Sequence, residues 1–337
     1  MIALGLTSFS IPFINQIGFK KGFIDKPDKR KHHNKEIVRI GGLSIAFAFF
    51  IPFFWLIFLG WFNSDELINI KLIFLSSFCF FILGFIEDVF RISMVSRLFS
   101  QIFISSLVWS FGLQIKIIDL SLILPDTNLI NLPNIISLFI TIVWIVGVTN
   151  SFNWIDGLDG LSSGLAAISL ISFSILSICF NQVSIFQVIG LLLGTCLGFL
   201  YFNFHPAKIF MGDGGTYLIG FLLSVFSIYT YNFLIENKVD QFALLFQFLI
   251  LFVPILDMAY VFFSRIFEGK SPFYPDRRHL HYRLQRIGFG HLETELLCYL
   301  LSINFSLLAF SQVFLRYRSY LLVSSLITQT LSEPEGI

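Results

Sequence analysis

Residues 134–180 read NIISLFITIVWIVGVTNSFNWIDGLDGLSSGLAAISLISFSILSICF, and this stretch indicates the fold class. Two apolar runs, 134–150 and 163–180, flank a short polar segment rich in Asn, Asp and Gly. Each run is close to the ~20 residues that an α-helix needs to cross about 30 Å of hydrocarbon. The stretch therefore predicts two membrane helices joined by a polar loop.

The same alternation of apolar runs and polar loops extends along the whole chain. Of the 337 residues 56% are hydrophobic and 13% charged, and the mean hydropathy is +0.82, which excludes a soluble domain of this size. We expect an all-α integral membrane protein with a single domain over 1–337. It would be a polytopic bundle of ten transmembrane helices, or eleven if the shorter stretch 319–328 also spans. The ten apolar stretches are 1–18, 42–62, 70–86, 98–115, 134–150, 163–180, 185–202, 216–234, 241–263 and 294–315.

Positive charge is concentrated in alternate loops. The five loops after the odd-numbered stretches hold 17 of the 22 Lys and Arg residues. By the positive-inside rule these loops face the cytoplasm and the amino terminus lies outside. Nearly every residue able to do chemistry lies in the same loops, so we predict an active site at the cytoplasmic face. The loops are 19–41, 87–97, 150–162, 203–215 and 264–293.

The first loop is strongly basic, because residues 20–42 read KKGFIDKPDKRKHHNKEIVRIGG. One interpretation is an anchor that rests on anionic lipid. The other is a phosphate-binding surface, in which Arg30, Lys31 and His33 lead into the glycine pair Gly41 and Gly42. Both interpretations stay open on the sequence alone.

The second loop begins with the acidic pair Glu87 and Asp88, in GFIEDVF. At the C-terminal end of a helix a carboxylate opposes the helix dipole, so the pair needs a compensating cation or metal unless the helix end is simply solvated. Neighbouring residues on a helix point about 100° apart, so only one of the two can aim directly at a given ligand.

The third loop, TNSFNWIDGLDGLSSG, carries Asn150, Asn153, Asp156 and Asp159 at a spacing of three residues. This spacing places them on one helical face or in one turn-rich loop. An EF-hand is excluded, because the alternate Asp spacing and terminal Glu are absent. Capping and turn formation is the alternative, but so many polar groups between two spans indicate function.

The fourth loop, FNFHPAKIFMGDGGTYLIG, places Asp213 among glycines at the start of an apolar helix. The residue is either an N-cap or, with a divalent cation, part of a site for a metal-bridged pyrophosphate. In the fifth loop, His279 and His281 stand among arginines such as Arg278. Zinc would need further ligands at suitable spacing, so phosphate groups of a nucleotide fit this loop better.

Carboxylates next to phosphates are typical of Mg²⁺ sites, because Mg²⁺ prefers oxygen ligands. Neither a Walker A sequence nor a GxGxxG fingerprint occurs, which excludes P-loop and Rossmann proteins. The residues thus predict a Mg²⁺-dependent enzyme that acts on phosphates at the inner membrane surface. The rival class is a secondary transporter, for which Asp257 is the clearest acidic residue inside a span, although we find no inverted repeat.

Five motifs in this order, DKPDKRKHH…RIGG, GFIEDVF, NSFNWIDGLDGLSSG, NFHPAKIFMGDGGT and PDRRHLHYRL, resemble those of the polyprenyl-phosphate N-acetylhexosamine-1-phosphate transferases. The resemblance spans about residues 20–290. It implies a bacterial inner-membrane enzyme with ten or eleven helices that transfers a sugar 1-phosphate from a UDP-N-acetylhexosamine to undecaprenyl phosphate and releases UMP. The GlcNAc-1-phosphate branch fits best, and the phospho-MurNAc-pentapeptide transferases are the sister alternative. No nucleic acid is expected as a partner, and a homodimer stays open.

The resemblance also implies roles for single residues, with Mg²⁺ as cofactor and Mn²⁺ as its substitute. Direct attack by the lipid phosphate is favoured, because a phosphate monoester with a second pKa near ~6 is already largely dianionic, while a phospho-aspartate intermediate stays open. Three positions depart from the family pattern: Glu87 replaces an Asp, Tyr282 a His and Val38 a Pro. The expected catalytic residues are Glu87, Asp88, Asp156 and Asp159, the substrate-binding residues Asn203, His279, His281, Arg278, Lys31 and His33, and the metal ligands Asp213 and Asn153.

Overall fold

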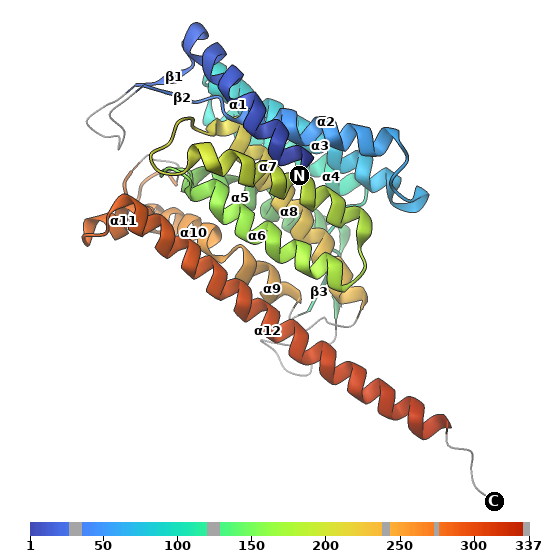
Figure 1. Cartoon of the computed structure of the whole chain (residues 1–337). Coiled ribbons are helices and arrows are strands. Elements are labelled where there is room, and N and C mark those ends of the chain that lie inside the picture. The colour runs from blue at the N-terminus through green and yellow to red at the C-terminus, as the bar shows by residue number, and fades with distance from the viewer. Residues whose placement is uncertain (27–35, 120–128, 238–242, 273–275, 333–337) are drawn as a thin grey trace, which may run out of the picture.

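The structure is a computed structural model that describes residues 1–26, 36–119, 129–237, 243–272 and 276–332, with side chains described as far as Phe314 in the last helix. Each of the ten predicted apolar stretches is helical, and the helices pack into one bundle (Figure 1). The helices are α1 (Ile2–Lys21), α2 (Gly42–Phe58), α3 (Ser64–Phe90), α4 (Met94–Ser110), α5 (Asn134–Ile155), α6 (Leu161–Cys179), α7 (Val183–Asn203), α8 (Gly212–Glu236), α9 (Ala243–Ile250), α10 (Phe252–Phe267), α11 (Leu280–Arg286) and α12 (His291–Ser332).

The protein is an all-helical integral membrane protein, but the count of spans differs from the expected ten or eleven. Among the described residues, seven helices are long and apolar enough to cross a membrane: α1, α3, α5, α6, α7, α8 and the first part of α12. Helices α9 and α10 qualify only together, as a pair bent by 81°, which makes eight. Helices α2 and α4 have 17 residues each, and the stretch 319–328 continues α12 and forms no helix of its own.

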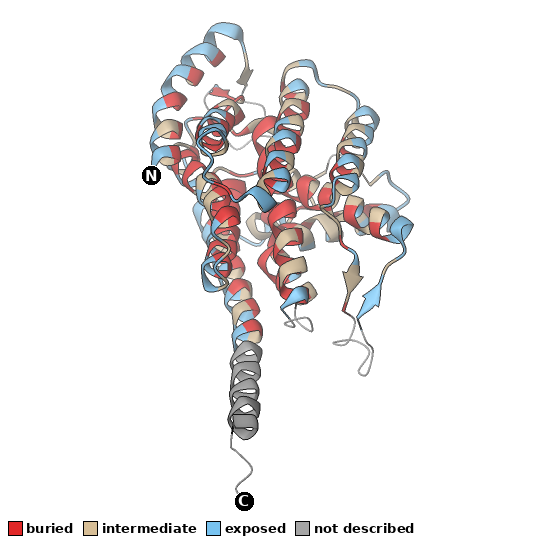
Figure 2. Ribbon diagram, turned by 90° about the vertical axis from the view of Figure 1, so that its right-hand side faces the viewer, coloured by how far each residue is buried: buried red, intermediate tan, exposed pale blue. Residues whose placement is uncertain are grey.

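Helix α8 lies at the centre of the bundle, against α2, α3, α5 and α6. Figure 2 shows buried residues on the sides of the helices that face the interior of the bundle and exposed residues on the outer sides. Glycines let the backbones approach closely: a Cβ at Gly84 of α3 would lie 2.3 Å from the carbonyl oxygen of Asp213, and one at Gly220 of α8 would lie 2.8 Å from Cα of Thr149 on α5. This packing brings the start of α8 next to the ends of α3 and α5.

The break between α9 and α10 is explained by Pro254. Proline has no N–H, so it cannot donate to the carbonyl of Ile250 one turn earlier. That carbonyl instead accepts a hydrogen bond from Ser169 Oγ of α6, at 3.2 Å. The chain turns there, and α10 leads toward the helix ends where α11 lies.

Two short antiparallel strand pairs mark the ends of the bundle. Strands β1 (Ile24–Asp25) and β2 (Ile37–Val38) pair with Ile24 opposite Val38. Strands β3 (Ile117–Ile118) and β4 (Ile130–Asn131) form the second pair. In Figure 1 the first pair and α11 lie at one end of the bundle and β3 at the other. Loops predicted to share one side are therefore found together.

Candidate active site

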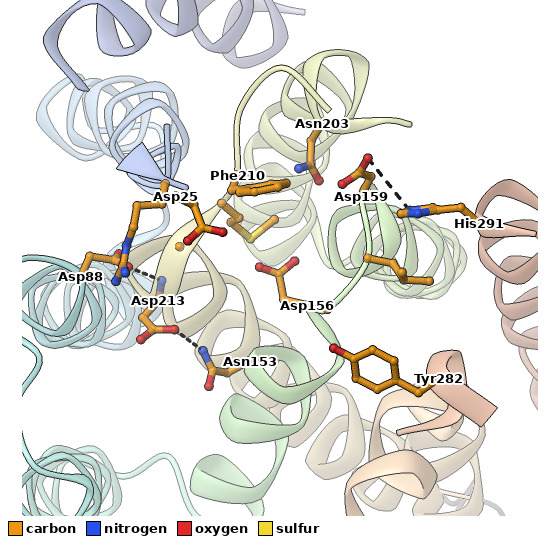
Figure 3. A pocket seen from close by; sticks show the side chains of 15 residues that line it. Asp25, Asp88, Asn153, Asp156, Asp159, Asn203, Phe210, Asp213, Tyr282 and His291 are labelled. Atoms are coloured by element: carbon orange, nitrogen blue, oxygen red, sulfur yellow. Dashed lines mark hydrogen bonds and ion pairs between the residues drawn. The ribbon is translucent and has the colours of Figure 1, made fainter. Parts of the chain in front are cut away.

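All five loops predicted to share one side contribute to a single pocket of about 320 Å³ (Figure 3). It is enclosed by the ends of α3, α5, α7, α8 and α12 and by the turn that enters α2. Five carboxylates line it, so its interior is strongly acidic. The lining residues are Asp25, Arg39, Asp88, Asn153, Asp156, Gly157, Leu158, Asp159, Asn203, Phe210, Met211, Gly212, Asp213, Tyr282 and His291.

Asp88 holds the start of α8. Its Oδ1 accepts a hydrogen bond from the amide of Asp213 at 3.0 Å, and its Oδ2 accepts one from the amide of Gly214 at 2.9 Å. Arg39 donates to Oδ1 at 3.3 Å, and the carboxylate side chain is only 2% exposed. The unfavourable position at the end of α3 is thus offset by a cation and by the positive end of α8.

Glu87 points elsewhere, as the 100° between neighbours on a helix requires. Its Oε1 accepts from Arg97 on α4 at 3.4 Å, and the residue does not line the pocket. Of the acidic pair, Asp88 alone faces the site.

Asp213 and Asn153 lie side by side across the α5–α8 contact. Asn153 Nδ2 donates to Asp213 Oδ1 at 2.6 Å and lies 3.0 Å from Thr216 Oγ1. The sequence left a helical face or a turn-rich loop open for Asn153; it lies in the last turn of α5, so a helix fixes its direction. Asn150, one turn earlier, bonds instead to Gln101 of α4 at 2.7 Å and faces away from the pocket.

Asp156 directly follows α5 and lies in the middle of the pocket, between Asp213 and Asp159 (Figure 3). Burial, together with the negative charges of Asp213, Asp88 and Asp159, raises the pKa of its carboxyl to about 8. Next to it, Gly157 leaves room for a ring, because a Cβ there would lie 2.5 Å from His281 Nε2.

Asp159 and Asn203 connect the α5–α6 turn to the α7–α8 loop. Asp159 Oδ2 accepts from the amide of Ala207 at 3.0 Å and lies 2.9 Å from His205 Nδ1. Asn203 Oδ1 accepts from the amide of Gly160 at 3.1 Å, and its Nδ2 donates at 2.9 Å to the carbonyl of Ile209 within its own loop. Asn203 lines the pocket while its amide holds the two loops together.

Of the described residues of the histidine motif only Tyr282 lines the pocket, while His279 and His281 lie behind it. His281 is buried against Gly157, and His279 stacks on it with ring centroids 5.7 Å apart. His279 Nδ1 lies 2.7 Å from Asp257 Oδ2, so this intramembrane aspartate, which had suggested a transporter, serves the histidine loop.

Arg278 is held outside the pocket. It bonds to Glu268 at 2.7 and 2.5 Å and to Asp276 at 2.9 Å. The two carboxylates neutralise the guanidinium and hold it away from the other predicted substrate-binding residues.

The glycine pair does not offer its amides to a phosphate. Gly41 and Gly42 donate to the carbonyls of Phe210 and Met211 at 2.9 and 2.7 Å, because α2 begins against the loop that precedes α8. This contact corrects the expectation for the pair. Lys31 and His33 lie outside the described residues.

Several pocket residues were not identified from the sequence. Asp25 and Arg39 lie in the basic loop, for which the sequence predicted a role only for other residues. Tyr282 was identified only as a departure from the family pattern. His291 lies outside the five motifs, and His205, which contacts Asp159 at 2.9 Å but does not line the pocket, was given no role in the fourth motif. Arg39 had the clearest signal, since it lies two residues before the glycine pair.

The donor set of the pocket fits a hard divalent cation. Carboxylate and amide oxygens converge from Asp88, Asn153, Asp156 and Asp213, and the raised pKa of Asp156 reports negative charge that a cation would neutralise. Asp213 and Asn153 are best placed to hold it, because each keeps one oxygen outside the hydrogen bond that joins them.

Comparison with known proteins identifies relatives of the whole bundle. The model of glycosyl transferase family 4 matches residues 70–231. A relative from Bacillus subtilis strain 168, named "Probable undecaprenyl-phosphate N-acetylglucosaminyl 1-phosphate transferase", is 31% identical over 88% of this chain and 79% of its own length. An undecaprenyl-phosphate alpha-N-acetylglucosaminyl 1-phosphate transferase of Pasteurella multocida strain Pm70 is 34% identical over 85% and 77%. A decaprenyl-phosphate N-acetylglucosaminephosphotransferase of Mycobacterium leprae strain TN is 47% identical over 32% of this chain and 29% of its own.

Proposed function

The chain belongs to glycosyl transferase family 4, and from this we propose that it transfers N-acetylglucosamine 1-phosphate from UDP-N-acetylglucosamine to undecaprenyl phosphate. An oxygen of the lipid phosphate attacks the β-phosphorus, the bond from this phosphorus to the UMP oxygen breaks, and UMP leaves. The observation that carries the proposal is the acidic pocket at one end of a membrane bundle, where a lipid phosphate and a water-soluble nucleotide can meet.

We infer that Asp213 and Asn153 hold Mg²⁺, for which Mn²⁺ would substitute. A bound ion would neutralise negative charge on the diphosphate and stabilise the charge that develops on the departing UMP. Asp156 faces the same space, and its raised pKa favours a role as an oxygen ligand or as a carrier of one proton. Asp159 borders the space on the opposite side from Asp88.

The surroundings of Asp88 favour direct attack over a phospho-aspartate intermediate. Both carboxylate oxygens already accept backbone hydrogen bonds from Asp213 and Gly214, and Arg39 donates to one of them. A carboxylate that accepts three hydrogen bonds would have to break these bonds before it could act as a nucleophile. We propose that Asp88 positions α8, and that Arg39, beside it in the pocket wall, meets the lipid phosphate.

We further propose that His279 and His281 help to hold the diphosphate of the nucleotide, with Asp257 fixing the ring of His279. The pocket end carries most of the Lys and Arg, which supports a cytoplasmic site in a bacterial inner membrane. On this topology α2, α4 and the bent pair α9–α10 also cross the bilayer, giving ten spans.

The test is release of UMP by purified protein given undecaprenyl phosphate, UDP-GlcNAc and Mg²⁺. We expect release that depends on the lipid and disappears in Asp213→Asn. The matched control is Asp65→Asn, which removes an exposed carboxylate at the far end of α3 and leaves release unchanged. No release with UDP-GlcNAc, UDP-GalNAc or UDP-MurNAc-pentapeptide would overturn the proposal.

A second experiment separates the two routes. Protein incubated with labelled donor and no lipid retains no label if the lipid phosphate attacks directly. Stable label on the chain would establish the covalent route and contradict the role given to Asp88.

A further inference from the structure

We propose that Asp159, His205 and His291, with the buried carboxylate of Glu295 beside them, form a second metal site at the edge of the pocket, one that takes a transition-metal ion such as Zn²⁺. The inference goes beyond the proposed reaction, which needs only the oxygen ligands around Asp213. It rests on four side chains that come from three distant segments of the chain.

The geometry of the first three residues suits one shared ion. One ligand atom each of Asp159, His205 and His291 lies within 4.8 Å of the other two. Asp159 Oδ2 lies 2.9 Å from His205 Nδ1 and 4.0 Å from His291 Nε2, and the two imidazoles are stacked with centroids 4.2 Å apart. Ligands of a tetrahedral zinc ion with bonds of about 2.1 Å are about 3.4 Å apart, so shifts of under about 1 Å complete the site.

The buried carboxylate of Glu295 is a second, independent reason to expect a cation at this place. It lies one helical turn after His291 on α12, so both side chains share one face of that helix. The residue is fully buried, and among the described residues its Oε2 has no hydrogen-bond partner. A buried carboxylate oxygen left unpaired is costly, and a cation would satisfy it. Glu295 Oε1 lies against Gly160, the residue that follows Asp159, which places the carboxylate beside the cluster.

The local backbone is shaped around this carboxylate. A Cβ on Gly160 would lie 2.3 Å from Glu295 Oε1, and Gly160 has a φ of +71°, which other residues rarely adopt. The hydroxyl of Tyr299 donates a hydrogen bond of 2.7 Å to the same oxygen and so fixes the orientation of the carboxylate. Such a supporting contact is typical of metal ligands, whose orientation is set by their neighbours.

The chemistry of the donors separates this site from the Mg²⁺ site. Two imidazole nitrogens and one carboxylate favour zinc or a related ion, whereas Mg²⁺ takes oxygen ligands. Figure 3 places Asp159 and His291 on the opposite side of the pocket from Asp88 and Asp213. A bound ion would tie the α5–α6 turn and the α7–α8 loop to α12 and so fix one wall of the pocket.

The test measures metal in untagged protein purified in detergent, exposed to Zn²⁺ and dialysed. We expect about one zinc per chain, and binding about 100-fold weaker or more in His291→Gln and in His205→Asn, because each removes a ligand. Glu293→Gln is the matched control, since this exposed neighbour on α12 caps the helix through Gly290 and lies outside the cluster. Asp213→Asn should also keep its zinc, which distinguishes the site from that of the proposed reaction.

Two further readouts need no variant. Co²⁺ in place of Zn²⁺ should give the intense visible absorption of a tetrahedral ion, and Zn²⁺ should raise the melting temperature of the wild type. A wild type that retains no zinc and shows no melting shift overturns the proposal, whatever the variants do. Zinc that persists in both histidine variants but is lost in Asp213→Asn overturns it as well.

Discussion

Replacing Gly84 by Ala should impair activity strongly while leaving the bundle folded. The added Cβ would lie 2.3 Å from the carbonyl oxygen of Asp213 and 2.8 Å from Cα of Gly214, both backbone atoms that cannot rotate away. Ordinary contact begins near 3.4 Å, so α3 and α8 must separate locally by about 1 Å. Asp88 lies one helical turn beyond Gly84, and its bonds of 2.9 and 3.0 Å to the start of α8 would lengthen beyond hydrogen-bonding distance.

The expected magnitudes separate catalysis from stability. Overpacking costs about 1–3 kcal/mol, while Ala gains about 1 kcal/mol over Gly in a helix, so the melting temperature in detergent should fall only slightly. A displacement of about 1 Å in a site can cost about 100-fold in rate, measured here as lipid-dependent UMP release. Gly190→Ala on α7 is the control, since a Cβ there meets nothing within 4 Å, and its activity should stay unchanged. Folded Gly84→Ala protein with activity within about threefold of wild type would refute the argument.

Three further changes test the electrostatics of the site. Because the pKa of Asp156 is raised from 3.8 to about 8, the folded state without metal favours its protonated form, and this contribution to stability is complete below about pH 4 and lost as the pH rises to about 8. Asp156→Asn in EDTA should therefore be more stable than wild type by a free-energy margin that grows from pH 5 to pH 8.5, with a ceiling of about 6 kcal/mol, and a margin independent of pH would contradict this. Asp88→Asn turns one acceptor into a donor facing the amides of α8, including that of Gly214, so calorimetry should register a loss of about 1–3 kcal/mol together with lost activity. Arg265→Lys cannot keep the two bonds of 3.2 and 2.9 Å to Asp276, so limited proteolysis should cleave the loop before α11 faster, and unchanged cleavage would show that the pair is dispensable.

The sequence predicted the helices and the shared side of the functional loops, because both follow from local properties. Apolar length sets where a helix can lie in the membrane, and loop charge sets which loops lie together. The direction of Asp88 relative to Glu87 also followed from helix geometry alone. The clustering of Asp88, Asn153, Asp156 and Asp213 was predicted by resemblance, and the structure supplies the contacts that join them.

What the sequence could not predict depends on packing between distant segments. Arg278 was expected to bind the substrate, but it forms ion pairs with Glu268 and Asp276 instead. His291 lies far along the chain from Asp159, and only the angle at which α12 crosses the bundle brings them within 4.0 Å. Pro254 is a signal in the sequence for a broken helix. The 81° bend also depends on Ser169 of α6, whose hydroxyl donates to the carbonyl that the proline leaves without its usual donor.

The convergence of all five loops on one pocket has a consequence for the order of synthesis. Helices enter the membrane from the amino terminus onward, so Asp88, Asn153 and Asp213 are in place while the ribosome is still translating the rest. Tyr282 and His291, which complete the wall, emerge near the end of the chain. A nascent chain therefore carries an acidic, half-open crevice until α11 and α12 follow and complete its wall.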